Sequence, residues 1–419
     1  MRSETLCLSR LYTVAFGCRP TYNSRMKARY QYRIYPTDQQ RQDLARLFGC
    51  CRVVWNDALA LCRQSEKLPS PTELQKICIT QAKKTVEREW LSEVSNIPLQ
   101  QSIQDLGVAF SNFFKSLKGE RKGPKMKPPR FKKRLNQQSA RFRKGGFSLK
   151  GAKVYLAKIG DIKTKWSRPL PSEPSSVTVI KDPSGRYFLS FVVEIEPIQV
   201  DAENQGIGVD LGLKIFAALS TGEKVQSPGY ARLNRKIRRE QRKLARRVKG
   251  SNRRERVRLR IAKLKAKISD IRKDFLHKLS TRLVRENSVV ALEDLNVSGM
   301  VKNRCLARAI SEAGWGTFRS MCEAKSTMVE ERQTIVINRW EPTSQICSEC
   351  RYRWGKLDLS VREVVCLNCG SVHCRDGNAS KNIETAGLEL AHAAKRTGRA
   401  CKTGLPAMPD EPSTCPGVA

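Results

Sequence analysis

The spacing of apolar positions changes several times along the chain and predicts alternating strands and helices. From residue 27 to 35 the sequence KARYQYRIY alternates with a period of two, as a half-buried strand does, and Pro36 ends it. Thr37 and Gln40 then form a capping-box pattern, and apolar residues recur at helical spacing from Leu44 onward. The chain therefore opens with a strand followed by a helix.

Helical spacing continues to about Leu117. Breaks at Pro69, Pro71 and Pro98 divide this region into three or four predicted helices. The next stretch, 118–134, is too rich in Gly, Pro and charge to hold a helix, and we interpret it as a basic linker.

Strand patterns resume near Phe142 and end in a predicted hairpin. Residues 177–181 and 186–196 flank a turn formed by the sequence DPSG. One face of the second strand is apolar, and its members are Tyr187, Leu189, Phe191, Val193 and Ile195. Together with the first strand, these segments predict a β-barrel interrupted by the helical module.

The second half of the chain begins with strands and continues with two basic helices. Residues 206–220 predict two strands around Asp210. A helical hairpin follows, with a turn at 250–252. The positions of its apolar seam are Leu233, Ile237, Leu244, Val248, Ile261, Leu264, Ile268, Ile271 and Phe275. Further on, 288–292 and 334–338 predict buried strands, separated by a helix over about 316–330.

Net charge identifies the class of partner. Lys and Arg outnumber Asp and Glu by 79 to 40, a formal charge of +39, and the basic residues run through the whole chain of 419 residues. A polyanionic partner follows, and nucleic acid is favoured over a membrane surface because basic segments alternate with globular strand patterns. No apolar run is long enough to span a bilayer. The length favours two to four compact units.

Cysteine spacing predicts a structural zinc site. Four of the 15 cysteines, Cys347, Cys350, Cys366 and Cys369, have the C-x2-C-x15-C-x2-C spacing of two knuckles around one tetrahedral Zn²⁺. Four thiolates leave no open coordination position, so the ion would be structural. His373 and Cys374 lie close enough to serve as substitute ligands. The odd cysteine count and this spacing favour a reducing cytosol over a disulfide framework.

Three acids stand at the ends of predicted elements. Asp210 closes a strand in GVDLG, Glu293 closes another in VVALED, and Asp376 opens a helical pattern in RDGNASKNI. Such a cluster could hold one or two Mg²⁺ ions against a scissile phosphate. Each acid alone is more typical of a turn or cap. No histidine stands in a triad pattern and no P-loop occurs, which disfavours serine-type hydrolysis and ATP-driven chemistry.

Several of these motifs, in one order, resemble the TnpB (OrfB) family of insertion-sequence proteins, relatives of the type V CRISPR effectors. The resemblance spans about 26–390. The motifs that carry it are YRIYPTDQQ, FGCCRVVWNDAL, GVDLGLK, LEDLNVSGM, AGWGTFR, PTSQICSEC and RDGNASKNI.

This resemblance implies a transposon-encoded, RNA-guided DNA endonuclease. Its RNase H-like (RuvC) domain would use Asp210, Glu293 and Asp376 as catalytic magnesium ligands. A transposon-derived guide RNA would pair with double-stranded target DNA beside a short transposon-adjacent motif. Tyr30 to Tyr35, the helical module and the barrel would form the lobe that binds RNA and reads the motif, comparable to the WED and REC parts of such effectors.

Two positions depart from the family pattern, and alternatives remain open. Cys374 stands where Asp is usual, and Arg351 where Gly often follows the second zinc cysteine. All three acids are present, which argues against a nuclease-silent RNA-guided regulator. A DNA transposase that joins strands would also use acidic metal ligands, and an accessory protein of transposition is a further alternative. Non-specific adhesion to nucleic acid is the simplest alternative for the basic surface.

We thus expect a multidomain α+β protein whose helical module is inserted in a β-barrel, followed by an RNase H-like α/β domain with an inserted basic helical hairpin and zinc ribbon. The predicted segments are an extension without assigned role (1–25), the first part of the barrel (26–45), the helical recognition module (46–118), the linker and rest of the barrel (119–200), the RuvC domain (201–341) with its hairpin (230–275), the zinc ribbon (342–373), the last RuvC segment (374–394) and a disordered tail (395–419). The expected location is the bacterial cytoplasm, on the nucleoid when DNA is bound. A monomer is the expected state.

Overall fold

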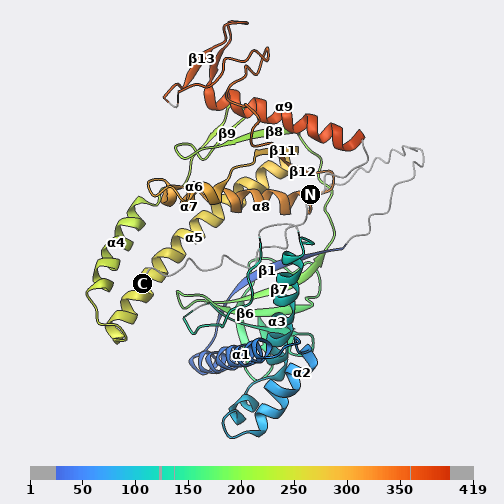
Figure 1. The fold of residues 1–419 in the computed structure, drawn as a ribbon, viewed down its shortest axis with the longest axis vertical. Coiled ribbons are helices and arrows are strands. Elements are labelled where there is room, and N and C mark those ends of the chain that lie inside the picture. Colours follow the sequence, from blue (N-terminus) through green and yellow to red (C-terminus); the bar gives the residue numbers. More distant parts are fainter. Residues whose placement is uncertain (1–24, 122–124, 136, 359, 397–419) are drawn as a thin grey trace, which may run out of the picture.

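The protein consists of a barrel-and-helix lobe and a second lobe that carries the zinc-ribbon segment, with a helical hairpin beside them (Figure 1). The computed structural model describes residues 25–121, 125–135, 137–358 and 360–396. The predicted extension and tail therefore lie outside the described residues, except for Arg25, Lys395 and Arg396. The last two belong to a helix that runs on past the predicted start of the tail.

The first lobe is built on a seven-stranded antiparallel sheet of order β2-β6-β7-β1-β5-β4-β3. Its strands are β1 (Met26–Tyr35), β2 (Gln138–Arg143), β3 (Phe147–Lys150), β4 (Lys153–Leu156), β5 (Gly160–Lys165), β6 (Ser176–Lys181) and β7 (Tyr187–Ile195). The two edge strands, β2 and β3, follow one another across a turn in which the Gly146 amide donates to the Arg143 carbonyl. The sheet is thus a nearly closed barrel, as the strand patterns predicted.

Alternation along β1 and β7 builds the barrel interior. Ala28, Tyr32 and Ile34 are buried, whereas the residues between them are exposed or half-buried. Leu189 and Phe191 of β7 are fully buried, which confirms the predicted apolar face. The first strand of the chain pairs with both β5 and β7. Residues more than 120 positions apart in sequence therefore meet in one sheet.

The helical module packs on the barrel and shares its apolar core. Its helices are α1 (Asp38–Gln64), α2 (Pro71–Gln75), the short irregular helices η1 (Lys76–Gln81), η2 (Ala82–Lys84) and η3 (Glu89–Glu93), and α3 (Asn96–Leu117). Thr37 caps α1 with the predicted capping box. The predicted break at Pro98 falls just before that residue: η3 ends at Glu93 and α3 begins at Asn96, so Pro98 lies in the first turn of α3, where its missing N–H is not needed. The described residues of 118–134 carry no helix or strand.

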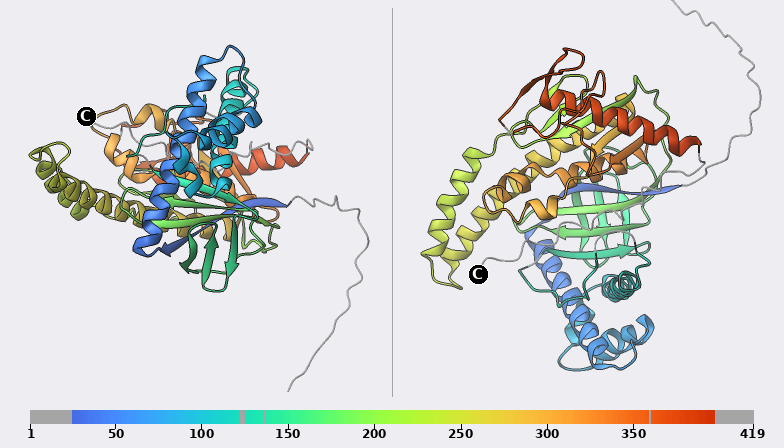
Figure 2. Two further views of the ribbon diagram at one scale, coloured as in Figure 1. Left: turned by 90° about the horizontal axis from the view of Figure 1, so that it is seen from below. Right: turned by 45° about the horizontal axis from the view of Figure 1, so that its top comes forward.

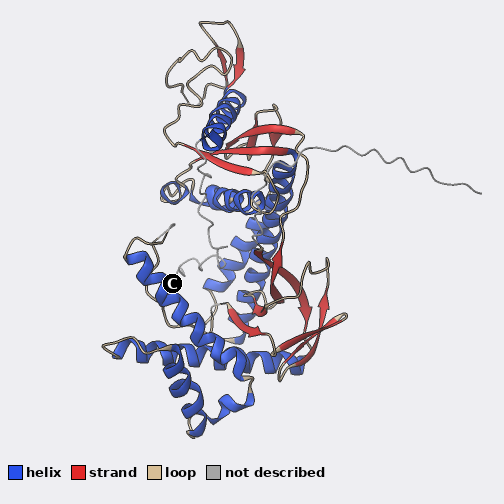
Figure 3. Ribbon diagram, turned by 90° about the vertical axis from the view of Figure 1, so that its right-hand side faces the viewer, coloured by secondary structure: helices blue, strands red, loops and turns tan. Residues whose placement is uncertain are grey.

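The second lobe contains a five-stranded sheet of order β10-β9-β8-β11-β12. Its strands are β8 (Asn204–Leu211), β9 (Ala217–Leu219), β10 (Lys224–Val225), β11 (Asn287–Glu293) and β12 (Gln333–Ile337). β8, β11 and β12 run parallel, whereas β9 and β10 are antiparallel to their neighbours. Parallel neighbours need helical crossovers, and long helices cover both faces of this sheet (Figure 3).

β11 is buried on both faces, in alternation. Val290 and Leu292 pack with α5 (Asn252–Glu286) and α8 (Trp315–Ser326). Val289 and Ala291 face α9 (Arg375–Arg396) on the other side. This lobe therefore has three layers, with the sheet in the middle. The short helices α6 (Val297–Met300) and α7 (Ala307–Ala313) lie between β11 and α8 in sequence.

The basic hairpin consists of α4 (Ala231–Ala245) and the long helix α5, which together extend from the body of the protein (Figure 2). Most of the predicted seam is confirmed, with Ile237, Ile261 and Ile268 buried. Val248 is an exception, because α4 ends at Ala245 and Val248 lies in the connecting loop with 77% of its surface exposed. The second helix also continues past its predicted end at 275 and packs into the core of the second lobe.

A short two-stranded sheet completes the second lobe. Its strands are β13 (Glu363–Val365) and β14 (Val372–Cys374), which lie in the segment predicted as a zinc ribbon. α9 follows β14 directly and lies across the sheet of the second lobe. Within the described residues, the helices are too short or too polar to cross a membrane.

Candidate metal centres

Asp210 and Glu293 lie at the carboxyl ends of neighbouring parallel strands. In the β8–β11 ladder Val209 is opposite Leu292, so the next residue on each strand is one of the two acids. Open sheets with parallel strands bind ligands outside these strand ends. The buried runs before each acid, GIGV and VVAL, fix both side chains at this edge.

Asp376 reaches the same edge from the first turn of α9. The helix lies so close to β8 that a Cβ on Gly208 would stand 1.9 Å from the Ser380 carbonyl oxygen. A Cβ on Gly387 would stand 2.4 Å from that of Ala291 on β11. Two glycines thus allow a close approach of helix and sheet that sets where α9 begins.

Glu293 and Asp376 lie near enough to Asp210 for their charges to act on its carboxyl. Burial raises the pKa of the Asp210 carboxyl to about 7, and the charges of Glu293 and Asp376 act in the same direction, while Arg375 opposes them. Like charges that are held together in this way are stabilised by a bound cation. Their oxygens are the ligands that Mg²⁺ prefers.

Two further side chains contact these acids, and neither was singled out from the sequence. The Thr343 hydroxyl donates to Glu293 Oε1 at 2.8 Å. Arg362, from the ribbon segment, lies 3.6 Å from Asp376 Oδ1. A hydroxyl and a guanidinium at separations of 50 and 14 positions leave no motif in a single sequence; only the fold brings them to the acids.

The four predicted zinc ligands come together. Their ligand atoms all lie within 4.8 Å of one another, and among the described residues they form the one group of three or more His, Cys, Asp or Glu side chains that meets this distance. The Sγ atoms of Cys347 and Cys369 are 3.7 Å apart, and those of Cys350 and Cys366 are 3.5 Å apart. Tetrahedral Zn–S bonds of about 2.3 Å require S···S distances of about 3.8 Å. The cluster therefore fits a zinc ribbon.

Each cysteine pair has the same knuckle geometry. The Arg351 amide donates to the Cys347 carbonyl, and the Gly370 amide donates to the Cys366 carbonyl. Both residues adopt a left-handed conformation, with φ of 65° for Arg351 and 74° for Gly370. The departure noted at Arg351 thus falls on a position that favours glycine.

His373 and Cys374 do not belong to the group of four. His373 is buried, and its Nε2 lies 3.1 Å from Cys347 Sγ, where it can donate a hydrogen bond to the thiolate. Cys374 is exposed, and its Sγ lies 3.4 Å from Lys224 Nζ. The four cysteines come together without either of these side chains.

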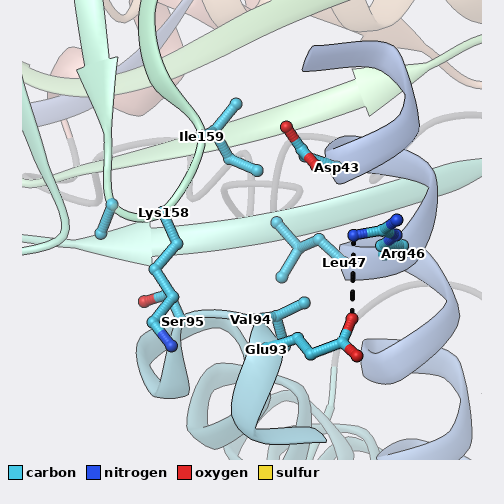
Figure 4. A pocket seen from close by; sticks show the side chains of 9 residues that line it. Asp43, Arg46, Leu47, Glu93, Val94, Ser95, Lys158 and Ile159 are labelled. Atoms are coloured by element: carbon cyan, nitrogen blue, oxygen red, sulfur yellow. Dashed lines mark ion pairs between the residues drawn. The ribbon is translucent and has the colours of Figure 1, made fainter. Parts of the chain in front are cut away.

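A small cavity of about 30 Å³ in the first lobe contains none of the predicted site residues (Figure 4). It lies between α1, η3 and the turn after β4, and the ion pair between Arg46 and Glu93 spans 3.8 Å at its edge. Apolar side chains such as Leu47 and Val94 line it. We assign it no role.

Three protein families match successive segments of the chain. Residues 26–67 match a family described as "Helix-turn-helix domain", residues 190–304 one described as "Probable transposase" of the OrfB type, and residues 315–383 one described as "Cas12f1-like, TNB domain". Within 26–67 the structure has β1 and α1. The fold and these matches thus define a multidomain protein with a domain of the RuvC-like transposase type.

Relatives along the whole chain give the family. A Streptomyces pristinaespiralis protein named "Putative RNA-guided DNA endonuclease" is 41% identical and aligns over 89% of this chain and 95% of its own length. A protein of Escherichia coli K12 named "Putative RNA-guided DNA endonuclease InsQ" is 29% identical over 92% and 97%. Mimivirus proteins named "TnpB-like" are about 25% identical. The chain belongs to the TnpB (OrfB) family, which confirms the resemblance.

A solved structure described as "Cryo-EM structure of the Cas12f1-sgRNA-target DNA complex" is also similar. Its TM-score is 0.47 at 14% identity, over 82% of this chain and 81% of that chain.

Proposed function

We propose that this protein is a transposon-encoded, RNA-guided DNA endonuclease that hydrolyses phosphodiester bonds with Mg²⁺. The observation that carries the proposal is the placement of Asp210, Glu293 and Asp376 at one sheet edge, where burial raises the pKa of Asp210 and the charges of the other two acids raise it further. The names of the relatives, from Streptomyces and Escherichia, support the same activity.

Asp210, Glu293 and Asp376 would hold the metal. Bound Mg²⁺ supplies activation of the attacking water and stabilisation of the leaving oxygen. The hydroxyl of Thr343 would orient Glu293 by its hydrogen bond, and Arg362 lies within ion-pair distance of Asp376. The strand order of the second sheet, with three antiparallel strands followed by two parallel ones, supports the assignment of an RNase H-like domain.

The zinc ribbon has a structural part in this proposal. Its four cysteines would hold one Zn²⁺. The segment between the two cysteine pairs contains Arg362, whose side chain lies beside that of Asp376. Loss of the metal would release both knuckles, because a structural zinc site contributes directly to the folding of its segment. The ribbon would thus stabilise the start of α9.

The first lobe and the basic hairpin would bind the guide RNA and the target duplex. The outer side of β1 combines basic and aromatic side chains, since Arg33 lies 5.6 Å from the ring centre of Tyr35. On the inner face of the same strand, Arg168 lies 4.3 Å from the ring centre of the half-buried Tyr30. Such combinations suit stacked bases and phosphates. Pairing with the guide would supply sequence specificity, while the protein would grip backbones and read the short motif.

One experiment tests this function. The protein is expressed with its native flanking DNA, the co-purified RNA is sequenced, and Mg²⁺-dependent cleavage of a matching target is measured with Asp210→Ala as control. We expect one discrete RNA and double-strand breaks that the substitution abolishes.

Other results would revise the proposal in defined ways. RNA-dependent binding without cleavage by the unsubstituted protein would identify a guided regulator. Joined DNA products would identify strand transfer, and the absence of a discrete RNA would refute guided recognition and leave non-specific adhesion.

A further inference from the structure

An open hollow of about 430 Å³ lies where β12 ends. Its lining consists of Asp294, Arg319, Val336, Ile337, Asn338, Arg339 and Trp340. Ile337, which lines it, is paired with the proposed magnesium ligand Glu293 across the β11–β12 ladder, so the hollow lies at the same edge of the sheet as that acid. The proposed chemistry has not used any of the side chains that line it.

Trp340 is the most unusual member of this lining. Its surface is 83% exposed, although an indole is among the most costly side chains to leave in water. The backbone beneath it is nevertheless held: the Trp340 amide donates to Asn338 Oδ1 at 3.1 Å, and the Glu341 amide donates to the Asn338 carbonyl at 3.1 Å. The structure thus presents an indole on a fixed turn.

This turn is tied to the acidic edge on both sides of Trp340. Before it, Arg339 donates from Nε to the Asp294 carbonyl at 3.0 Å and from a terminal nitrogen to Asp294 Oδ2 at 2.6 Å. After it, Thr343 donates to Glu293. Trp340 therefore lies between Arg339 and Thr343, which hydrogen-bond to Asp294 and Glu293 at the end of β11. These bonds restrict the position of Trp340 relative to Glu293.

The charges around the hollow are arranged to hold this geometry. The Asp294 carboxylate accepts from both Arg339 and Arg319, and Arg319 also pairs with Glu323 at 2.8 Å. Two guanidinium groups and two carboxylates balance, so the hollow has no excess positive charge of its own. A ligand there is held by the aromatic face more than by ion pairing, which suits a nucleobase better than a phosphate.

We propose that Trp340 is a base-stacking platform that positions the DNA strand being cut, with one nucleobase near the scissile phosphate lying on the indole. Stacking tolerates every base, so it suits a nuclease whose sequence specificity comes from a guide. This inference rests on the proposed function. In this role Trp340 is a substrate-positioning residue, and it acts on single-stranded DNA after the duplex has opened.

The first test is single-turnover cleavage by the guide-bound protein. Trp340→Ala is expected to slow cleavage about 5- to 150-fold, the range for loss of one stacked base, while target binding stays within about twofold. Trp340→Phe restores most of the rate because it keeps an aromatic face. Leu390→Ala, which removes another exposed apolar side chain at the far end of α9, leaves the rate unchanged.

A double-mutant cycle separates stacking from general damage to the fold. Abasic sites are placed one at a time in the cut strand of the target. At one position the abasic site slows the unsubstituted protein as Trp340→Ala does, and it has no further effect on that variant. In an Asp210→Ala background, which prevents cutting, single-stranded DNA quenches less tryptophan fluorescence once Trp340→Phe is added.

The outcomes distinguish this inference from the function beneath it. If the unsubstituted protein does not cut, the proposed function fails. If it cuts and Trp340→Ala cuts equally well, or if every abasic position adds to the effect of that variant, only the stacking platform is refuted.

Discussion

At the scale of single residues, the two knuckles of the ribbon have the same backbone but different residues after the second cysteine. Arg351 and Gly370 both have positive φ and donate the same hydrogen bond. A residue with a Cβ is strained in this conformation by about 1 kcal/mol, whereas glycine is not.

We therefore expect Arg351→Gly to raise the stability of the zinc-bound ribbon by about 1 kcal/mol. The matched substitution Gly370→Ala should lower it by a similar amount, because it introduces the same strain in the other knuckle. Zinc affinity measured by competition with a chelator checks both. Equal affinities in the two variants would contradict the strain argument.

A second prediction concerns the repulsion at Asp210. Asp210→Asn keeps the shape of the side chain but removes a buried charge that Glu293 and Asp376 disfavour. In a chelating buffer we expect the variant to unfold at higher denaturant concentration than the unsubstituted protein, while its Mg²⁺-dependent cleavage falls by at least about 100-fold. Denaturant titration and a cleavage assay measure the two effects. A variant that is less stable without metal would show that the carboxylate has a structural role.

At the scale of elements, the contact between β8 and α9 positions the third acid. Gly208 has no room for a Cβ, because Ser380 O and Glu384 N would lie 1.9 and 2.6 Å from it. Both atoms belong to backbone, so the helix itself would have to move.

Gly208→Ala is accordingly expected to destabilise the protein by about 1–3 kcal/mol and to displace Asp376, with loss of most cleavage. Gly316→Ala is the matched control: Gly316 lies in α8 with nothing within 4 Å of the added Cβ, and alanine should stabilise the helix by up to about 1 kcal/mol. Thermal unfolding and cleavage rates of both variants check this. Full activity of Gly208→Ala would show that α9 does not fix the site.

At the scale of the whole molecule, the charge of +39 is spread over lobes and hairpin, and the hairpin carries much of it on exposed helix faces. An ion pair joins the hairpin to the first lobe, since Arg186, which also donates to Asp182 in its own turn, donates to Asp270 of α5. The hairpin can therefore contribute to the surface on which a polyanion lies.

For the hairpin we expect a decrease in the salt dependence of RNA binding when exposed arginines of α4 are neutralised. Each of Arg235→Gln, Arg238→Gln and Arg242→Gln should reduce the slope of log K against log[salt] by up to about 0.9 for each phosphate that the variant no longer neutralises. Binding titrations from low to moderate salt measure the slope. A slope that does not change in the triple variant would exclude α4 from the binding surface.

What the sequence determined by itself is local. The strand at the start of the chain, the Thr37 capping box, the seam around Ile237 and the cysteine spacing each depend on side chains a few positions apart, where periodicity and turn chemistry act directly. The family motifs indicated the class of protein and the three candidate acids. Each motif is a short segment, so it too can be recognised without knowledge of the fold.

Tertiary structure alone decided what depends on distant segments. The barrel joins β1 to β5 and β7. Helix α9 lies against β8 because Gly208 lacks a side chain. Thr343 and Arg362, which no sequence motif indicated, contact Glu293 and Asp376. Likewise, Val248 does not pack in the predicted seam, because α4 ends before it and the residue lies exposed in the connecting loop. Periodicity reports which face of an element is buried, but not what covers that face, because the covering side chains come from elsewhere in the chain.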